Sequence, residues 1–228
     1  TGTAGQALGQ GFVVDFSKYM NKILDYNLEE KWVLVEPGLV LDTLNSFFSP
    51  HGLMFGPSVA PSSRATLGGM INTDGCGKGS RIYGRTSQHV LEIYLTLING
   101  EEIIIKPKLL SEVDKDPFLT AIKNAIKEAE PYYKKLPQLR RFLTGYNLNH
   151  VINETGAIDL IPLVSGSEGT LGFITKAKLG LMPIPKHKKL YLLHYDSFSQ
   201  ALSQSQSIVD FNPSAVETID EKLLQLAH

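Results

Sequence analysis

Cysteine is almost absent from the chain, because Cys76 is the only one among 228 residues. A lone cysteine excludes an internal disulfide framework and a cysteine-rich metal site, and it is typical of a reducing compartment. We therefore expect a cytoplasmic protein, at most peripheral to the inner membrane. The six histidines never stand three or four residues apart, so no helix presents a two-histidine metal face and we expect no metal site.

Long apolar runs and an excess of one charge are also missing. No stretch approaches the roughly 18 apolar residues of a membrane span. Lysine and arginine (22) nearly balance aspartate and glutamate (23), which leaves a formal net charge of −1. Such a balance gives no electrostatic footprint for nucleic acid or an anionic membrane. We expect neither a membrane span nor a nucleic-acid partner.

Three common motifs of nucleotide-binding proteins and hydrolases are absent. The chain has no G-x-x-x-x-G-K-[ST] phosphate loop and no G-x-S-x-G nucleophile elbow. A dinucleotide fingerprint requires a strand, then a glycine loop, then a helix. Here the glycines of residues 1–11 precede the apolar run at residues 12–16, so the order does not fit.

Glycine is what the sequence has in excess. Residues 61–84 contain Gly68, Gly69, Gly75, Gly77, Gly79 and Gly84. Glycine at this density is tolerated where the backbone takes a positive φ or closely approaches another object. A flexible linker fits poorly, because Leu67, Met70 and Ile71 are interleaved with the glycines and belong in an ordered fold. A crossing of two backbones and a cradle for a ligand both remain open.

Two further small-residue segments, residues 1–11 and 165–172, resemble this one in composition. Consecutive backbone N–H groups in such turns bind anions without any basic side chain. Since only Lys78 and Arg81 are close in sequence, backbone recognition of a buried diphosphate cofactor fits better than a charge-driven phosphate clamp. The structural alternative is that all three segments are tight turns at the rims of a sheet.

The hydrophobic patterns predict a mixed α+β chain, with alternating or short apolar runs as strands and helical spacing as helices. The expected strands are residues 12–16, 23–27, 31–36, 91–97, 103–105, 171–181, 190–195 and 215–219, and the expected helices are 39–49, 117–130, 199–209 and 220–227. Residues 23–36 should form a hairpin. Residues 131–163 lack a sustained period, and we expect an ordered loop there.

Two local signals specify a turn and a helix start. Asn99 and Gly100 stand between alternating runs and predict a type I′ hairpin turn, with positive φ at both residues. Asp116 predicts an N-cap, and Pro117 the first turn of a helix that should end before Pro131.

Four sequence blocks follow one another along the chain. They are TGTAGQALGQGFVVDF, EPGLVLDTLNSFF, ATLGGMINTDGCGKGSRIYGRTSQHV and SGSEGTLGFITKAKL. Together they resemble the FAD-binding domain of the vanillyl-alcohol oxidase (PCMH-type) superfamily, and within it the FAD-linked D-2-hydroxyacid dehydrogenases acting on D-lactate, glycolate or D-2-hydroxyglutarate. The similarity covers essentially the whole chain. The stretches LTGYNLNHV and ATLGGMINTD are most similar to the large bacterial D-2-hydroxyglutarate dehydrogenases, which carry FAD and, further along a much longer chain, an iron–sulfur region.

The resemblance implies a two-subdomain PCMH-type FAD-binding fold of the α+β class, with FAD extended between the subdomains, and the start of an α/β cap domain. The βαβα order expected after residue 190 agrees with such a start. We predict an FAD-binding domain in residues 1–185, with its N-terminal part missing, and the beginning of a truncated cap or substrate domain in residues 186–228. Relatives with covalently attached flavin have a histidine where this chain has Thr1, so the resemblance implies non-covalent FAD. An iron–sulfur cluster would belong only to a C-terminal region outside this chain.

The resemblance also implies three groups of cofactor contacts. Gly2 and Thr3 lie in the loop that holds the diphosphate. The segment beside diphosphate, ribityl chain and ring contributes Pro57, Gly68, Gly69, Thr73, Asp74 and Gly75, and the opposite side contributes Glu168, Gly169, Gly172 and Ile174. Close relatives have asparagine in place of Asp74, and a carboxylate beside a diphosphate is unfavourable unless it is hydrogen-bonded or turned away, so its contact stays open. Tyr146 and Asn147 are candidates for residues beside the ring, with a purely structural role as the alternative.

In the family, the C2 hydride of a D-2-hydroxyacid passes to flavin N5 while a base takes the hydroxyl proton. The implied partners are therefore a small 2-hydroxyacid substrate and an electron acceptor. The residues that hold the carboxylate and remove the proton are expected mainly beyond His228, so no catalytic residue is named and the chain alone is expected to be inactive. An FAD oxidase acting on another alcohol and a non-catalytic nucleotide-binding module remain as alternatives.

Overall fold

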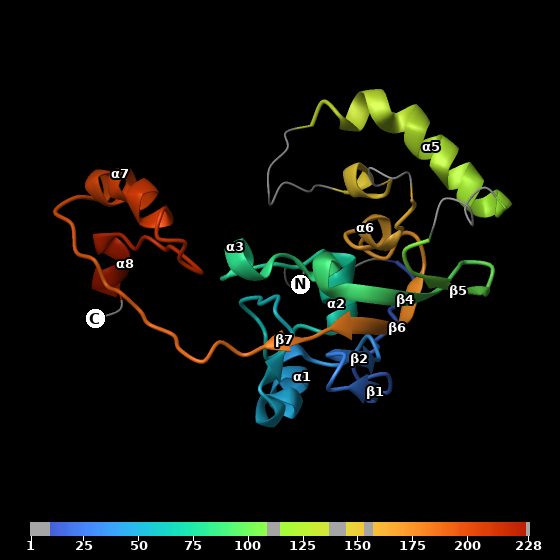
Figure 1. The fold of residues 1–228 in the computed structure, drawn as a ribbon, viewed down its shortest axis with the longest axis horizontal. Coiled ribbons are helices and arrows are strands. Elements are labelled where there is room, and N and C mark those ends of the chain that lie inside the picture. Colours follow the sequence, from blue (N-terminus) through green and yellow to red (C-terminus); the bar gives the residue numbers. More distant parts are fainter. Residues whose placement is uncertain (1–9, 109–114, 137–144, 153–156, 227–228) are drawn as a thin grey trace.

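An antiparallel sheet of five strands, in the order β1-β2-β6-β4-β5, organises the molecule. The computed structural model describes residues 10–108, 115–136, 145–152 and 157–226 (Figure 1). The strands are β1 (Ile23–Asn27), β2 (Trp32–Val35), β4 (Val90–Thr96), β5 (Glu102–Ile105) and β6 (Phe173–Gly180). A second, two-stranded sheet joins β3 (Leu53–Met54) to β7 (Met182–Pro183). Together with the helices, these sheets confirm the α+β class.

Strand β6 is the centre of the large sheet. Its Ala177 lies opposite Val35 of β2 on one side and Ile93 of β4 on the other, and all three are at most 1% exposed. Lys178 alternates to the other face, where its Nζ lies 3.9 Å from the centre of the Trp32 ring. The strand predicted for residues 171–181 is thus confirmed, with one face buried and the other toward solvent.

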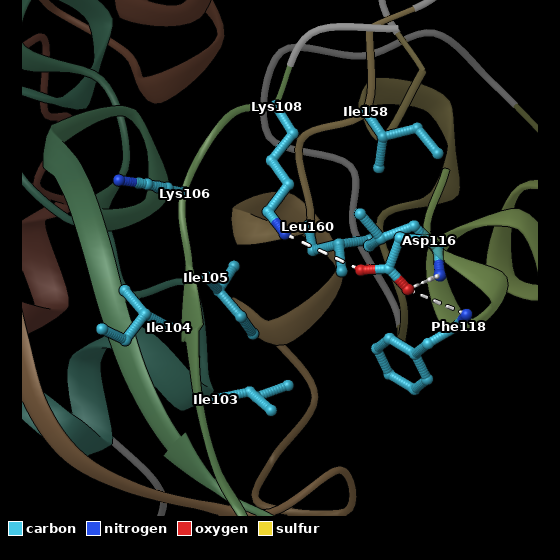
Figure 2. A pocket seen from close by; sticks show the side chains of 10 residues that line it. Ile103, Ile104, Ile105, Lys106, Lys108, Asp116, Phe118, Ile158 and Leu160 are labelled. Atoms are coloured by element: carbon cyan, nitrogen blue, oxygen red, sulfur yellow. Dashed lines mark hydrogen bonds and ion pairs between the residues drawn. The ribbon is translucent and has the colours of Figure 1, made fainter. Parts of the chain in front are cut away.

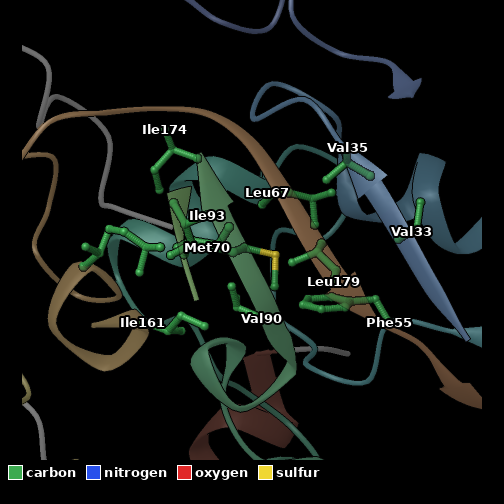
Figure 3. Close-up of a cluster of buried hydrophobic side chains, with 14 of the residues drawn as sticks. Val33, Val35, Phe55, Leu67, Met70, Val90, Ile93, Ile161, Ile174 and Leu179 are labelled. Atoms are coloured by element: carbon green, nitrogen blue, oxygen red, sulfur yellow. The ribbon is translucent and has the colours of Figure 1, made fainter. Parts of the chain in front are cut away.

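Helix α2 (Leu67–Asn72) packs on the buried face of this sheet. Its Leu67 and Met70 are buried and join Ile93 and Leu179 in one hydrophobic cluster (Figure 3). The backbone N–H of Leu67 also donates to the carbonyl of Leu39 (2.9 Å). The first part of the glycine-rich segment is therefore a packed helix, which excludes the flexible linker.

Helix α1 (Leu41–Phe48) confirms the helix predicted for residues 39–49. Leu41, Leu44 and Phe48 follow the helical spacing and are buried. The chain then forms the 3-10 helix η1 (Ser49–His51) and turns at Gly52, whose φ is 69°. Left-handed glycine is a common helix stop because it carries no Cβ.

Of the remaining helices, α5 (Pro117–Tyr133) and α7 (Phe198–Val209) are long and the others are short. The short ones are α3 (Ser80–Tyr83), α6 (Ile161–Val164) and α8 (Glu221–Leu226), with the 3-10 helices η2 (Thr86–His89) and η3 (Leu148–His150). As predicted, Asp116 caps α5 by accepting from the N–H groups of Phe118 and Leu119. The predicted stop before Pro131 was wrong, because α5 runs through it to Tyr133. Pro131 lies in the last turn, so the hydrogen bond that it removes and the distortion from its ring affect only the end of the helix. The described part of residues 131–163 holds this helix end, η3 and the start of α6.

The turn between β4 and β5 differs from the predicted type I′ turn. Gly100 has a φ of 85°, whereas Asn99 is not among the residues of positive φ. The N–H of Gly100 donates to Leu97 O (2.9 Å), and the N–H of Leu97 donates to Glu101 O (2.8 Å). A turn with negative φ followed by a left-handed glycine joins twisted strands as well as a type I′ turn does, so the hairpin itself is confirmed.

Three predicted strands do not form. Residues 12–16, 190–195 and 215–219 have no strand pairing, and their apolar side chains are largely exposed, with Phe12 fully so and Leu190 82% exposed. The pattern was strand-like, but a strand requires a neighbour to pair with, and the described part of the chain offers none to these runs. Helices α7 and α8 are confirmed. They lie apart from the large sheet, beyond an extended segment (Figure 1). The division at residue 185 remains a prediction.

Within the described ranges, none of the helices combines the length and the apolar character that a membrane crossing requires.

The aromatic end of α1 provides a test of the packing. Phe48 is fully buried, whereas its neighbour Phe47 is 43% exposed. We expect Phe48→Ala to lower the free energy of unfolding by about 3–5 kcal/mol, because it leaves a cavity in the core. Phe47→Ala should cost about 1 kcal/mol or less. Urea unfolding measures both, and equal losses would show that the helix is not packed as described.

Asp159 provides a test by pH. Its Oδ1 accepts from the Ile161 N–H (2.9 Å) at the start of α6. Burial raises the pKa of Asp159, and the hydrogen bond from Ile161 opposes the rise. A raised folded-state pKa means that ionisation weakens the fold at pH values above it. Asp159→Asn keeps an acceptor for Ile161, so we expect the variant to be the more stable at about pH 7 and the two proteins to converge near pH 3, where both side chains are neutral. An advantage that persists at pH 3 in urea unfolding would contradict this cause.

Candidate functional site

Two of the three small-residue segments meet at the end of α2. The N–H of Gly166 donates to Ile71 O (3.0 Å), and the N–H of Glu168 donates to Asn72 O (2.9 Å). The turn at residues 165–172 is therefore fastened by its backbone to the last residues of α2. This contact could not be predicted from the sequence, because the two segments are far apart along the chain.

Residues 145–147 join the same place from a third direction. The hydroxyl groups of Tyr146 and Thr170 are 2.7 Å apart. Thr170 donates to Ser167 O (2.6 Å), so its oxygen accepts from Tyr146. Asn147 is buried, with its Oδ1 2.8 Å from His150 Nδ1. We call the meeting point of α2, residues 145–147 and residues 165–172 the junction.

Three of the glycines are explained by close backbone packing. A Cβ on Gly68 would lie 2.6 Å from Pro37 Cβ, one on Gly77 2.6 Å from Ser58 O, and one on Gly172 2.6 Å from Thr96 O. Real Cβ atoms do not tolerate such contacts with neighbouring backbone or a rigid ring. The crossing of backbones, left open by the sequence, is thus confirmed at these positions.

Gly69 and Gly75 are not explained in this way. A Cβ on Gly69 would meet only Thr66 Oγ1, at 3.2 Å, and one on Gly75 would have no neighbour nearer than 3.5 Å. Neither residue has a positive φ of the kind that requires glycine. Glycine inside a helix costs about 1 kcal/mol relative to alanine, so Gly69 is unfavourable for α2 itself. Close approach of a ligand is the remaining physical reason for these two glycines.

Asp74 follows α2 with its carboxylate engaged by the protein. Its φ is 44°, and its Oδ1 accepts from the N–H of Ser87 (2.8 Å). Its Oδ2 lies 3.5 Å from Nη1 of Arg85, and the two side chains are only 4% and 13% exposed. Within the described residues, the Asp74 carboxylate therefore contacts Ser87 and Arg85, and its contact with the cofactor remains a prediction. Both partners were missed, since nothing in their spacing singles them out.

Four buried side-chain atoms find no hydrogen-bond partner among the described residues. They are Asn72 Oδ1, Asp74 Oδ2, Arg85 Nη1 and Ser165 Oγ. A buried polar atom without a partner costs about 1–3 kcal/mol. All four belong to the junction or to the Asp74–Arg85 pair beside it. These four atoms lie close together. A polar ligand bound there would supply their missing hydrogen-bond partners.

The other predicted site residues lie in different surroundings. Pro57 is buried after β3, and Thr73 donates from its hydroxyl to Gly69 O (2.9 Å). Glu168 and Gly169 are exposed with positive φ. The side chain of Ile174 is buried in the hydrophobic core of the sheet. Gly2 and Thr3 lie outside the described residues.

A groove of about 1210 Å³ continues from this region between α3 and the C-terminal segment. Arg81 spans it, donating to Asn212 Oδ1 (2.7 Å) and Val209 O (3.1 Å), while Lys78 pairs with Glu217 (2.9 Å). These contacts were also missed, because they join residues far apart in sequence.

A separate pocket lies between β5 and α5 (Figure 2). It holds about 90 Å³ and is lined mainly by apolar side chains, with Lys108 Nζ 3.9 Å from Asp116 Oδ2 at its edge. This volume is below the roughly 300–1,000 Å³ of a typical ligand pocket. It belongs to the packing of α5.

Comparison with known families identifies the N-terminal region. Residues 1–106, which include α2 and the glycine-rich segment, match the FAD binding domain family. Residues 1–106 carry an FAD-binding domain. The predicted family and cofactor are thus confirmed.

Relatives of this FAD-binding domain extend the similarity to the whole chain. It is 44% identical over 240 residues to the D-2-hydroxyglutarate dehydrogenase of Haemophilus influenzae, covering 100% of this chain and 23% of that protein. It is 27% identical over 221 residues to D-lactate dehydrogenase [cytochrome] 1, mitochondrial, of Saccharomyces cerevisiae, covering 96% of this chain and 30% of the relative. The chain thus spans about a quarter of the length of these relatives. Alkyldihydroxyacetonephosphate synthase shares the fold, with a TM-score of 0.61 at 19% identity over 93% of this chain and 31% of its own.

The residues of the junction fit FAD. The flavin ring and the diphosphate offer hydrogen-bond donors and acceptors, which the unpartnered atoms of Asn72 and Ser165 require. Gly69 and Gly75 leave room for a close approach. Within the described residues, no group of three or more histidine, cysteine, aspartate or glutamate side chains is arranged to hold a metal ion. Which residues contact FAD remains a prediction.

Substitutions at the neighbouring residues Gly68 and Gly69 distinguish a role in packing from a role in cofactor binding. We expect Gly68→Ala to destabilise the protein with and without FAD, because its Cβ collides with Pro37. Gly69→Ala should leave the apo protein as stable or up to about 1 kcal/mol more stable, because alanine favours a helix. The same change should weaken FAD binding by about tenfold or more. Thermal unfolding and titration with FAD measure the two effects, and unchanged FAD affinity in Gly69→Ala would remove α2 from the cofactor site.

Proposed function

We propose that this chain is the FAD-binding part of a dehydrogenase that oxidises a D-2-hydroxyacid, of the hydroxyglutarate or lactate type, to the 2-oxoacid. The observation that carries the proposal is the 44% identity to a D-2-hydroxyglutarate dehydrogenase along the whole chain. Residues 1–185 would form the FAD-binding domain and residues 186–228 the start of a cap. The electron acceptor and the cytoplasmic location, at most peripheral to the inner membrane, remain predictions from the sequence.

The proposed cofactor contacts come from the three segments of the junction. Gly69 and Gly75 would admit FAD to the backbone of α2 and the turn after it, while Gly169 and Glu168 would border it from the other side. Asn72 and Ser165 would satisfy their buried oxygens by hydrogen bonds to it. Gly2 and Thr3, with Pro57, Gly68, Thr73, Gly172 and Ile174, complete the proposed set. FAD, when bound, supplies the capacity to accept the hydride of the substrate.

The protein's own groups hold this site in shape. The Asp74 carboxylate lies beside the Arg85 guanidinium and accepts from a backbone N–H, so its negative charge is partly compensated. The bond from Tyr146 to Thr170 fixes residues 145–147 against the turn at 165–172. Rigid positioning of a cofactor before the reaction is a major contribution of protein to catalysis. We assign no catalytic base to this chain, and Tyr146 and Asn147 are proposed only as neighbours of the ring.

The test uses the whole protein that contains this chain. We expect it to carry flavin that acid denaturation releases, which shows non-covalent attachment. Anaerobic addition of D-2-hydroxyglutarate or D-lactate should bleach the flavin absorbance, whereas the L enantiomers should not. In a separate assay in air, an artificial dye should be reduced with little release of peroxide.

Each alternative has its own outcome in this experiment. Peroxide released in step with substrate oxidation would show an oxidase. FAD binding without bleaching by any 2-hydroxyacid or other alcohol would show a non-catalytic module. Absence of flavin, with no gain when FAD is added, would contradict the proposal entirely.

A further inference from the structure

The Asp74–Arg85 pair is a buried ion pair with imperfect geometry. Its closest atoms are 3.5 Å apart, and neither Asp74 Oδ2 nor Arg85 Nη1 forms a hydrogen bond with the described residues. Removing two charges from water is costly, and a buried pair repays the cost only with excellent geometry and further hydrogen bonds. This pair therefore contributes little to stability in the protein alone, and its presence calls for a role beyond stability.

The position of the pair points to the cofactor. Cβ of Asp74 lies 3.7 Å from where a Cβ on Gly166 would be, and the carbonyl oxygen of Gly145 lies 3.6 Å from the same point. Asp74 thus stands where all three segments of the junction meet. A cofactor that contacts these segments has the pair as a neighbour.

The surroundings fix the Asp74 carboxylate and the backbone from which the Arg85 side chain extends. Asp74 Oδ1 accepts from the Ser87 N–H (2.8 Å), and the backbone N–H of Arg85 donates to Gln88 Oε1 (2.9 Å). The neighbouring hydroxyl of Thr86 donates to Gly75 O (2.6 Å), which ties η2 to the end of α2. Charges held rigidly and away from water act over several ångströms with little screening.

We propose that the charges of Asp74 and Arg85 act in opposite directions on the reduction potential of the bound flavin, an inference that rests on the proposed function. Flavin gains negative charge when it takes up electrons. Asp74 opposes this gain and Arg85 favours it, so the wild-type potential reflects their balance. If the pair served only to link α2 to η2, the loss of either single charge would change stability but not the potential.

The experiment is a double-mutant cycle in the whole flavin-loaded protein, with the midpoint potential measured by equilibration with reference dyes. Asp74→Asn should raise the potential, because it leaves Arg85 unopposed. Arg85→Gln should lower it, because it leaves Asp74 unopposed. The double variant should return close to the wild-type value. Asparagine tolerates the positive φ of Asp74 and can still accept from Ser87, so the first variant is expected to fold.

Matched controls separate a local effect from net charge. Lys127→Gln and Glu128→Gln make the same changes of charge on exposed positions of α5 and should leave the potential unchanged. If Arg85→Gln does not retain FAD, Arg85→Lys takes its place and should keep the potential near wild type while Asp74→Asn still raises it. Unchanged potentials in flavin-loaded Asp74→Asn, or shifts of both single variants in one direction, would overturn the inference. A wild-type protein that binds no FAD would instead contradict the proposed function.

Discussion

The structure depends on two main-chain hydrogen bonds, from Gly166 to Ile71 O and from Glu168 to Asn72 O. They join the end of a helix packed on one face of the sheet to the turn that enters the central strand. They bring together a helix and a turn that are far apart in the sequence. Backbone bonds of this kind place the chain without committing side chains, so Asn72 Oδ1 and Ser165 Oγ have no hydrogen-bond partner in the part of the chain that the structure describes.

The glycines show why composition alone leaves function open. Gly68, Gly77 and Gly172 are required by neighbouring groups of the protein itself, and Gly69 and Gly75 are not. In the sequence, the two kinds are indistinguishable and even adjacent. A dense glycine cluster predicts that something lies close to the backbone. Only the fold reveals whether that object is another part of the chain or a ligand.

Structure that depends on neighbouring residues was predicted well from the sequence, whereas contacts between residues far apart in the sequence were not predicted. The hairpin of β1 and β2, the helix α1 and the cap at Asp116 each depend on neighbours within a few residues, and all three are confirmed. The runs at 12–16, 190–195 and 215–219 have the composition of strands, but pairing is a property of the partner as much as of the run. In the same way, Asp74 was singled out from the sequence while Arg85 was not. The significance of Arg85 arises only in the fold, where the turn after α2 brings its side chain beside that of Asp74.

The strand order has a consequence for how the molecule assembles. β1 pairs with β2, and β4 with β5, so each can form as a hairpin from neighbouring residues. β6 is synthesised after all four, yet among the described strands it is the one that joins the two hairpins into a single sheet. Contacts between distant residues form late and slowly because the intervening loop must first be closed. The turn at residues 165–172 leads directly into β6, so we expect insertion of this strand both to close the sheet and to bring the turn onto α2.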